Sequence, residues 1–360
     1  MPAKIPATIV TGFLGAGKTT LIQHLMTHAD RRIALIVNEF GDLGVDGDIL
    51  RGCGIEGCSD DDMIELSNGC ICCTVADDFV PAMQKLLDRA DPPEHIVIET
   101  SGLALPQPLV RAFAWPDLAT RVTVDGVVTV LDGPAVAEGT FAADVAAVDR
   151  QRAADDGLDH ETPLSELYAD QVACADMIVL NKTDLMEDVP AMLDRLRVEV
   201  RAGVQIVPAV KGALPADVLL GRSMAAEDDM TARHEVHHHH HHDDDHHDDH
   251  HHHDHGHDDH GHDAFESFVV HGAPVADPAR FADELASLIR HHGILRLKGF
   301  AAVEGRPMRL TVQAVGPRVA HHYDRPWGAD APATRLVVIG PRGLDRSAIE
   351  RSLSGALAPA

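Results

Sequence analysis

The chain has 360 residues, which is enough for two domains or for one large domain with an appendage. Asp and Glu number 57 against 30 Lys and Arg, and the net charge of −27 argues against nucleic acid and anionic membranes as partners. We find no signal peptide and no apolar run that could cross a bilayer, so we expect a cytoplasmic protein whose six cysteines are reduced.

The stretch 12–19 reads Gly-Phe-Leu-Gly-Ala-Gly-Lys-Thr and matches the phosphate-binding loop pattern at every fixed position. A β-branched run at 7–11 predicts a buried strand before it, and apolar residues at helical spacing predict a helix after it. Such a turn aims backbone N–H groups and the positive end of the helix dipole at one point, which suits a phosphate. We therefore expect a nucleoside triphosphate, with Lys18 at the β- and γ-phosphates and Thr19 holding Mg²⁺. The alternative is a glycine-rich turn with a solvated lysine.

A second buried strand is predicted at 33–37, and Glu39 follows it. Strands of nucleotide-binding α/β sheets deliver functional side chains at their carboxyl ends, so we expect Glu39 at the same rim as the phosphate loop. The alternative is a solvated loop carboxylate. In the glycine- and aspartate-rich segment that comes next, Asp46 is a candidate Mg²⁺ ligand or water-orienting residue.

Residues 51–78 have little regular pattern and hold five cysteines, including Cys70, Cys72 and Cys73. Several thiolates within a few residues can chelate Zn²⁺, Co²⁺ or Cu⁺ with little further ordering of the chain. Cys70 and Cys72 share a face of an extended chain, whereas Cys70 and Cys73 share a face of a helical turn. All three converge only if the chain turns, which Gly69 permits. We predict a metal site here; the alternative is a set of buried and inert thiols.

A helix is predicted at 79–87, followed by an apolar strand at 95–98 that runs into Glu99 and, three residues later, Gly102. In phosphate-loop NTPases a neighbouring strand ends in an acid that holds Mg²⁺ or its water, and a nearby glycine N–H senses the γ-phosphate. Glu99 and Gly102 occupy these places in the sequence.

Further strands are predicted at 122–131 and from Gln205 onwards, with a flexible loop at 150–161 and a helix at 164–172. This alternation of strands and helices favours a mostly parallel sheet that is covered on both faces. We expect the isolated Cys174 to be buried and inert.

An apolar run at 177–180 leads into Asn181, Lys182, a threonine and Asp184. The carboxylate of Asp184 can accept two hydrogen bonds from the N1–H and 2-amino groups of guanine, which adenine does not offer. The stem of Lys182 can lie along the base. At the end of a strand and downstream of a phosphate loop, this run predicts that the nucleotide is GTP.

The segment 237–262 consists almost entirely of His, Asp and Gly, so we expect a disordered linker that captures metal; the alternative is a simple spacer. The chain after it predicts an α+β domain with an antiparallel sheet, in which His321, His322 and Trp327 are expected to be exposed. The domains we predict are a P-loop GTPase domain at 1–222, the linker at 223–263 and the smaller α+β domain at 264–360.

These motifs together resemble the CobW family of metal-handling GTPases, and the resemblance covers nearly the whole chain. It is carried by the phosphate loop, the Asn-Glu-Phe-Gly run at 38–41, the Cys-Ile-Cys-Cys run at 70–73, and the runs at 99–102 and 181–184. The segments 52–58 and 68–78 resemble the members of cobalamin biosynthesis more than the zinc-handling members. Cys53 and Cys58 go beyond the motif that the family shares, which leaves open which thiols bind the metal.

The resemblance implies a GTP-dependent metallochaperone whose thiolate site forms in the GTP-bound state and releases its metal on hydrolysis. It also implies delivery of Co²⁺ to the cobaltochelatase of cobalamin biosynthesis. We expect slow intrinsic turnover, because no arginine finger is identifiable in the sequence. The alternatives are a zinc or nickel metallochaperone of the same family, a His-rich metal buffer, and a small-molecule kinase, against which the guanine motif argues.

The predicted site residues fall into three groups. The residues expected to bind GTP are Gly12, Gly15, Ala16, Gly17, Lys18, Thr19, Thr20, Gly102, Asn181, Lys182 and Asp184. Those expected to act in hydrolysis are Lys18, Thr19, Asp46 and Glu99, with Thr19 and Glu99 on Mg²⁺. Those expected to bind the transported Co²⁺ or Zn²⁺ are Glu39, Cys70, Cys72 and Cys73.

Overall fold

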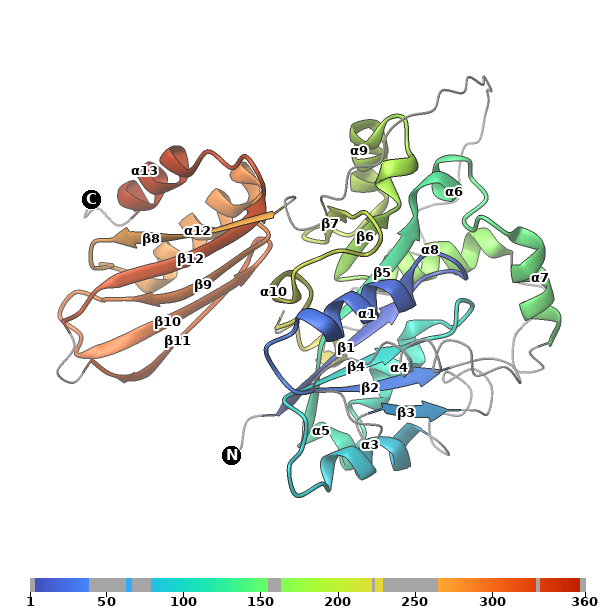
Figure 1. Cartoon of the computed structure of the whole chain (residues 1–360). Helices are drawn as coiled ribbons and strands as arrows, with labels where there is room; N and C mark the ends of the chain where they lie inside the picture. The colour runs from blue at the N-terminus through green and yellow to red at the C-terminus, as the bar shows by residue number, and fades with distance from the viewer. Residues whose placement is uncertain are drawn as a thin grey trace. The chain divides into compact units, whose positions relative to one another are not determined.

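The computed structural model of the chain contains two compact units, Met1–Gly261 and His262–Ala360 (Figure 1). The residues that it describes are 4–38, 63–66, 79–154, 163–221, 224–228, 265–327 and 331–356. None of the helices in these ranges is long and apolar enough to span a membrane.

The first unit is built on a parallel sheet of seven strands in the order β3-β2-β4-β1-β5-β6-β7, which confirms the predicted mostly parallel sheet. Every residue of β4 and β6 is buried, because helices cover both faces and leave no side of these strands in contact with water. The strands are β1 (Ile5–Thr11), β2 (Ile33–Asn38), β3 (Met63–Leu66), β4 (His95–Glu99), β5 (Val122–Asp132), β6 (Met177–Asn181) and β7 (Gln205–Pro208).

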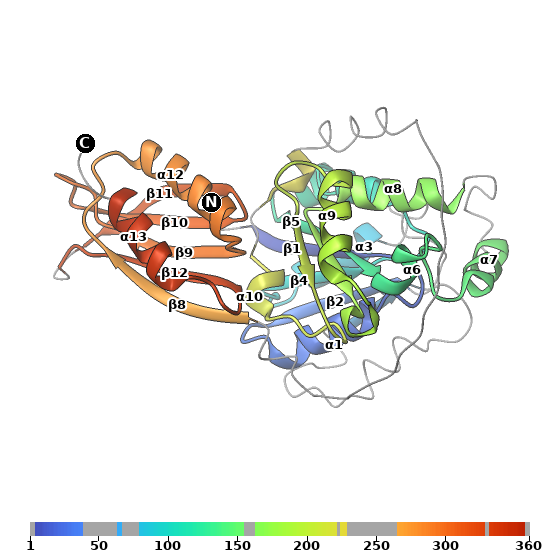
Figure 2. The same ribbon diagram turned by 90° about the horizontal axis from the view of Figure 1, so that it is seen from above.

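Helices lie on both faces of this sheet, with α1 on one face and α8 on the other (Figure 2). A core cluster packs α3, α4 and α5 against β1, β2 and β4, and includes a pair of rings, Phe79 and Phe113, with centroids 5.6 Å apart. The helical segments are α1 (Lys18–His28), α3 (Val80–Leu87), α4 (Pro106–Ala112), α5 (Pro116–Ala119), α6 (Gly133–Ala137), α7 (Val145–Ala154), α8 (Leu164–Cys174), η3 (Thr183–Leu185), α9 (Val189–Glu199), α10 (Ala216–Leu219) and η4 (Ala226–Asp228).

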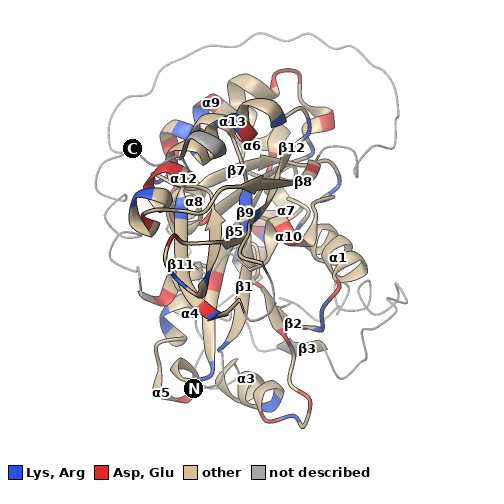
Figure 3. Cartoon of the chain, turned by 90° about the vertical axis from the view of Figure 1, so that its left-hand side faces the viewer, with Lys and Arg blue, Asp and Glu red and all other residues tan. Residues whose placement is uncertain are grey.

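Charged residues of this unit lie mainly on the helices and loops, while the strands of the sheet are largely uncharged (Figure 3). This distribution follows from burial, since an ion inside the sheet would lose its hydration without a compensating partner. Two charged residues, Glu99 and Asp132, are the last residues of β4 and β5.

The second unit is an antiparallel five-stranded sheet in the order β11-β10-β9-β12-β8, with two helices packed on it, as the α+β prediction requires. Its longer helix begins after Asp277, whose side chain accepts the first backbone N–H groups, and ends at Gly293 in the left-handed region. The elements are β8 (Phe265–Gly272), α12 (Pro278–His292), β9 (Arg296–Ala301), β10 (Met308–Val315), β11 (Arg318–Pro326), β12 (Thr334–Pro341) and α13 (Arg346–Ala356).

Two sequence predictions differ from this structure, and two of its strands were not predicted. The strands β3 and β11 were not predicted, and α7 occupies the first part of the segment expected to be a flexible loop at 150–161. Trp327, expected to be exposed, is only 9% exposed and packs edge to face on Phe300 at 5.7 Å. His321 and His322 are exposed on β11, as expected.

Candidate functional site

The turn between β1 and α1 adopts a conformation that only glycine permits. Gly12, Gly15 and Gly17 have φ angles of 134°, 79° and 101°, in the region that side chains disfavour. A Cβ atom added to Gly12 would lie 2.1 Å from the carbonyl oxygen of Val130, and one added to Gly17 would lie 2.3 Å from Nδ2 of Asn181. The loop is therefore packed directly on β5 and β6. Gly12 and Gly17 are required both because their φ angles are positive and because a Cβ atom would clash with these strands.

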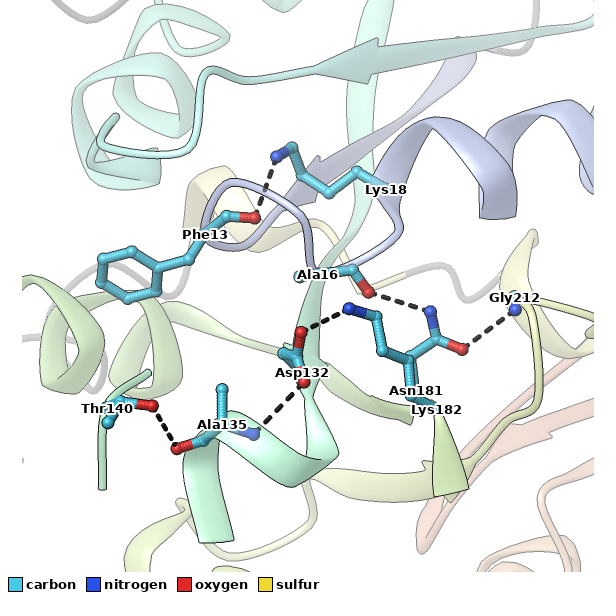
Figure 4. A network of polar contacts seen from close by, with 9 residues as sticks. All are labelled: Phe13, Ala16, Lys18, Asp132, Ala135, Thr140, Asn181, Lys182 and Gly212. Atoms are coloured by element: carbon cyan, nitrogen blue, oxygen red, sulfur yellow. Dashed lines mark hydrogen bonds and ion pairs between the residues drawn. The ribbon is translucent and has the colours of Figure 1, made fainter. Parts of the chain in front are cut away.

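The lysine of the loop folds back over it. Nζ of Lys18 lies 3.4 Å from the carbonyl oxygen of Phe13 (Figure 4). The same oxygen also accepts the backbone N–H of Ala16 at 3.2 Å. Lys18 is the first residue of α1, so its ammonium lies at the positive end of the helix dipole. This concentration of positive charge suits an anion such as a nucleotide phosphate.

A hydroxyl and a carboxylate meet beside the loop. β4 pairs with β1 so that Glu99 stands opposite Val10, two residues before the loop begins. Oγ1 of Thr19 donates to Oε1 of Glu99 at 3.1 Å, and Glu99 is only 3% exposed. Oxygen atoms of this kind are the ligands that Mg²⁺ prefers, so this pair fits the ion that accompanies a nucleoside triphosphate.

The segment that follows β4 packs against the phosphate loop. A Cβ atom on Gly102 would lie 2.7 Å from the backbone nitrogen of Leu14, so the two backbones touch. Nε2 of Gln171, a fully buried residue of α8, donates to the carbonyl oxygens of Gly102 at 3.0 Å and Ala104 at 3.3 Å. The sequence offered no motif that would have singled out Gln171.

Asn181 at the end of β6 joins two loops. Its Nδ2 donates to the carbonyl oxygen of Ala16 at 2.9 Å, and its Oδ1 accepts the backbone N–H of Gly212 at 3.0 Å (Figure 4). The asparagine therefore ties the phosphate loop to the loop that follows β7. This bond places the run 181–184 beside the glycine-rich turn.

Lys182 and Asp184 take different positions after Asn181. Lys182 has a φ of 59°, and its Nζ lies 2.5 Å from Oδ2 of Asp132, a residue that is 1% exposed. The other carboxylate oxygen of Asp132 accepts the backbone N–H of Ala135 and so caps α6. Asp184 lies in η3 and is exposed to solvent. Sequence reasoning did not find Asp132 as the partner that fixes the lysine.

Three aromatic rings pack next to one another, and the first of them belongs to the phosphate loop. The rings of Phe13 and Phe141 are 6.4 Å apart, and those of Phe141 and Tyr168 are 4.7 Å apart. Phe141 holds a φ of 63°, a strained value for a bulky residue, which costs about 1–3 kcal/mol and is offset here by the packing of the rings. Burial and the neighbouring carboxylate of Glu199 raise the pKa of the Tyr168 hydroxyl, which therefore stays protonated and donates to Oε2 of Glu199.

The predicted metal ligands Glu39, Cys70, Cys72 and Cys73 lie outside the described residues, as do Asp46, Cys53 and Cys58. Their roles stay predictions. Cys174 is a free thiol buried in α8, as expected. Within the ranges that the structure describes, no three His, Cys, Asp or Glu side chains are grouped so that they could hold a metal ion.

The chain is similar to known proteins over nearly its full length. A family model described as the CobW/HypB/UreG nucleotide-binding domain matches residues 6–210, and one described as the cobalamin synthesis protein cobW C-terminal domain matches residues 265–357. A Sinorhizobium protein named zinc chaperone CobW is 53% identical over 98% of this chain and 97% of its own length. A Pseudomonas aeruginosa protein of the same name is 52% identical over 99% and 92%. The Escherichia coli zinc chaperone YjiA is 29% identical over 93% and 94%.

Proposed function

The chain belongs to the CobW/HypB/UreG family, and we propose that within this family it is a GTP-dependent metallochaperone. In this proposal it binds a divalent transition metal in the GTP-bound state and releases the metal after slow hydrolysis of GTP, in the cytoplasm. The observation that supports the nucleotide part best is the bond from Asn181 to Ala16, which brings the guanine-recognition run next to the phosphate loop.

Each part of the site has a role in this proposal. Lys18 would exchange its contact with the Phe13 carbonyl for the β- and γ-phosphates, and Thr19 and Glu99 would hold Mg²⁺, which neutralises phosphate charge when bound. Asp184 accepts the hydrogen-bond donors of guanine, while the Lys182 stem, anchored by Asp132, lies along the base. The remaining phosphate contacts come from Gly12, Gly15, Ala16, Gly17 and Thr20, the γ-phosphate sensor is Gly102, and the water-orienting residue is Asp46.

The register of the sheet supports a metal site next to this pocket. β2 is parallel to β4 and sets Val37 opposite Glu99, so β2 ends at the rim where Glu99 ends its strand, and Glu39 is the next residue in the sequence after β2. β3 is parallel to β2 and sets Leu66 opposite Asn38, four residues before Cys70. Both segments that carry the predicted ligands therefore depart from one rim of the sheet. In the proposal, bound GTP orders these segments, and its hydrolysis releases them.

The cargo we favour is Zn²⁺. Two relatives at 52% and 53% identity carry the name zinc chaperone, and thiolate sites bind Zn²⁺ more tightly than Co²⁺ by intrinsic order. Co²⁺ remains the second candidate, because the matching C-terminal family takes its description from cobalamin synthesis. That candidate would make a cobaltochelatase the acceptor, whereas a zinc cargo calls for an acceptor with a zinc site.

A metal competition separates these candidates. Zn²⁺, Co²⁺ and Ni²⁺ would compete for the full chain against a chromophoric chelator, with Mg²⁺ and a non-hydrolysable GTP analogue present. We expect Cys72→Ser and Cys73→Ser to remove one tight Zn²⁺ site, and Cys174→Ala, which changes only the buried thiol of α8, to leave it in place. An unchanged tight site in both serine variants would rule out the thiolate cage, and a site that prefers Co²⁺ would reverse the assignment of the cargo.

Gln171 should matter for GTP more than for GDP. Gln171→Leu removes the donor that holds the carbonyl groups of Gly102 and Ala104 against the phosphate loop. Because Gly102 is the proposed contact to the γ-phosphate, we expect affinity for a GTP analogue to fall about tenfold, with little change for GDP. Equilibrium binding of both nucleotides to the same preparation measures this ratio.

Gln107→Leu is the matched control for this substitution. Gln107 is also a buried glutamine, and its Nε2 donates to the carbonyl oxygen of Asp170 in α8 at 3.3 Å rather than to Gly102 or Ala104. We expect this variant to keep the parent's ratio of GTP to GDP affinity. Equal loss of both nucleotides in Gln171→Leu would show that Gln171 only supports the fold.

A further inference from the structure

The carboxylate of Asp132 contacts two elements at once. Asp132 is the last residue of β5 and is 1% exposed, and the register of the sheet sets it opposite Asn181, the last residue of β6. Its Oδ1 accepts the backbone N–H of Ala135 at 3.2 Å, and its Oδ2 lies 2.5 Å from Nζ of Lys182 (Figure 4). One buried side chain therefore joins the start of α6 to the run that follows β6.

The run after β6 is held from both of its neighbouring strands. On the side of β7, the backbone N–H and the hydroxyl of Thr183 donate to the carbonyl oxygen of Ala209 at 3.2 and 3.0 Å. On the side of β5, the ion pair with Asp132 holds the side chain of Lys182. The sheet order β5-β6-β7 places these contacts on opposite sides of the run. The position of the Lys182 side chain therefore depends on Asp132.

The two charges of this ion pair need one another in different ways. The side chain of Lys182 is 28% exposed, so without its partner the ammonium could turn into water on its flexible stem. The side chain of Asp132 is 1% exposed, and a carboxylate at that depth is strongly destabilising without a cation. The lysine therefore stabilises the buried aspartate, and the aspartate determines where the lysine points.

We propose that Asp132 is a positioning residue of the nucleotide pocket: its carboxylate holds Lys182 where the lysine stem packs on guanine, and so it sets how long a guanine nucleotide stays bound. This inference rests on the proposed function and adds to it a control of residence time. The base contacts the lysine, whereas Asp132 acts through the lysine from its buried place on β5.

A competing explanation is that Asp132 only caps α6, since its Oδ1 satisfies the N–H of Ala135 in the first turn of that helix. Asparagine caps a helix as well as aspartate does, and its oxygen can accept the same N–H. It carries no charge, however, and its amide nitrogen is a donor that cannot accept from Lys182. Asp132→Asn therefore removes the ion pair and keeps the cap, so the two explanations predict different results for this variant.

The residence time is measured by loading the full chain with a fluorescent GDP analogue and chasing it with excess GDP. We expect Asp132→Asn to speed dissociation about tenfold, because a contact between charged groups is lost. A GTP analogue should be affected to the same extent, since Lys182 lies at the base in this proposal and not at the γ-phosphate. A role in helix capping alone predicts the dissociation rate of the parent.

Inorganic pyrophosphate shows whether the loss lies at the base. Pyrophosphate can occupy the phosphate loop without a base, so we expect it to compete equally well for the parent and for Asp132→Asn. A general loosening of the pocket would weaken pyrophosphate and GDP together, and that result would overturn the inference.

The preference of the parent for GDP over ADP tests the proposed function separately. If the parent has no such preference, guanine recognition and this inference both fail. If the parent prefers GDP but Asp132→Asn releases it at the parent's rate, the inference fails alone.

Asp176→Asn is the matched control. Asp176 precedes the first residue of β6, about 17 Å along the strand from Asn181. It is also 1% exposed, its Oδ2 accepts the backbone N–H of Val127 at 2.9 Å, and its Oδ1 lies 3.5 Å from Nη2 of Arg201. We expect this variant to lower the free energy of unfolding and to leave the dissociation rate of GDP unchanged. Equally fast release from Asp176→Asn would show that the rate reports only on stability, and would overturn the inference.

The variant Lys182→Met completes a double-mutant cycle, because methionine keeps an apolar stem and loses the ammonium. It leaves the carboxylate of Asp132 buried without its cation, so we expect it to unfold at a lower temperature than the double variant Asp132→Asn, Lys182→Met. In the dissociation of GDP the two substitutions should not add, because they break one contact. A double variant whose rate shows the product of the two single effects would mean that Asp132 acts on the nucleotide by another route, which would contradict the inference.

Discussion

Asp184→Asn should weaken GTP binding by about 100-fold and create binding of xanthosine triphosphate. In the proposed complex the carboxylate accepts from both N1–H and the 2-amino group of guanine, whereas an asparagine amide would replace one acceptor by a donor. That donor meets the amino group of guanine unfavourably and the 2-oxo group of xanthine favourably. Because Asp184 is exposed in η3, the substitution should leave the fold intact. Competition binding with GTP, XTP and ATP gives the three affinities.

Asp188→Asn is the control for this experiment. Asp188 is also exposed, lies four residues further along, and accepts the backbone N–H of Ala191 at 2.9 Å as the N-cap of α9. Asparagine is an equally good N-cap, so we expect neither stability nor nucleotide preference to change. If Asp184→Asn bound GTP as the parent does, guanine recognition would have to come from elsewhere.

The parallel sheet could be predicted because its strands have a local signature. The strands β1, β2, β4 and β6 are short apolar runs that end in polar residues, a pattern that buried parallel strands require. The phosphate loop was equally visible, since its glycines are imposed by backbone angles at fixed positions. The clash of a Cβ on Gly12 with Val130 adds a reason that the sequence does not contain, because the partner strand lies more than 100 residues away.

The missed strands lack that signature. Nearly every residue of β11 is exposed, so the strand has no apolar alternation and is defined by its register with β10. β3 has only four residues and is recognised by its pairing with β2. Trp327 is buried because Phe300, from a different strand, provides an edge-to-face contact. Each of these features depends on contacts between distant parts of the chain.

The same limit applies to the site. Gln171 reaches Gly102 across 69 residues, and Lys182 reaches Asp132 across 50. A glutamine within a helix, such as Gln171, and an aspartate at the end of a strand, such as Asp132, are too common in sequences to indicate a role. The motif residues Thr19 and Glu99, by contrast, were predicted from the sequence to bind one Mg²⁺ ion together. In the structure their side chains are hydrogen-bonded to each other.

The nucleotide should control the affinity for the transported metal. β2 and β3 end at the rim where Glu99 contacts Thr19, so we expect a triphosphate bound there to favour one arrangement of the segments that follow these strands in the sequence. We expect Zn²⁺ to bind more tightly with a GTP analogue and Mg²⁺ than with GDP, by a factor of about 5 to 150, which is the usual range for coupled sites.

This coupling is measured most directly through the affinity for the nucleotide, because metal that binds elsewhere without coupling to the nucleotide does not change that affinity. Linkage requires Zn²⁺ to tighten binding of the GTP analogue by the same factor. The account predicts this gain in the parent, a smaller effect or none with GDP, and loss of the gain in the double variant Cys72→Ser, Cys73→Ser. Equal affinity for the GTP analogue with and without Zn²⁺ in the parent would contradict it.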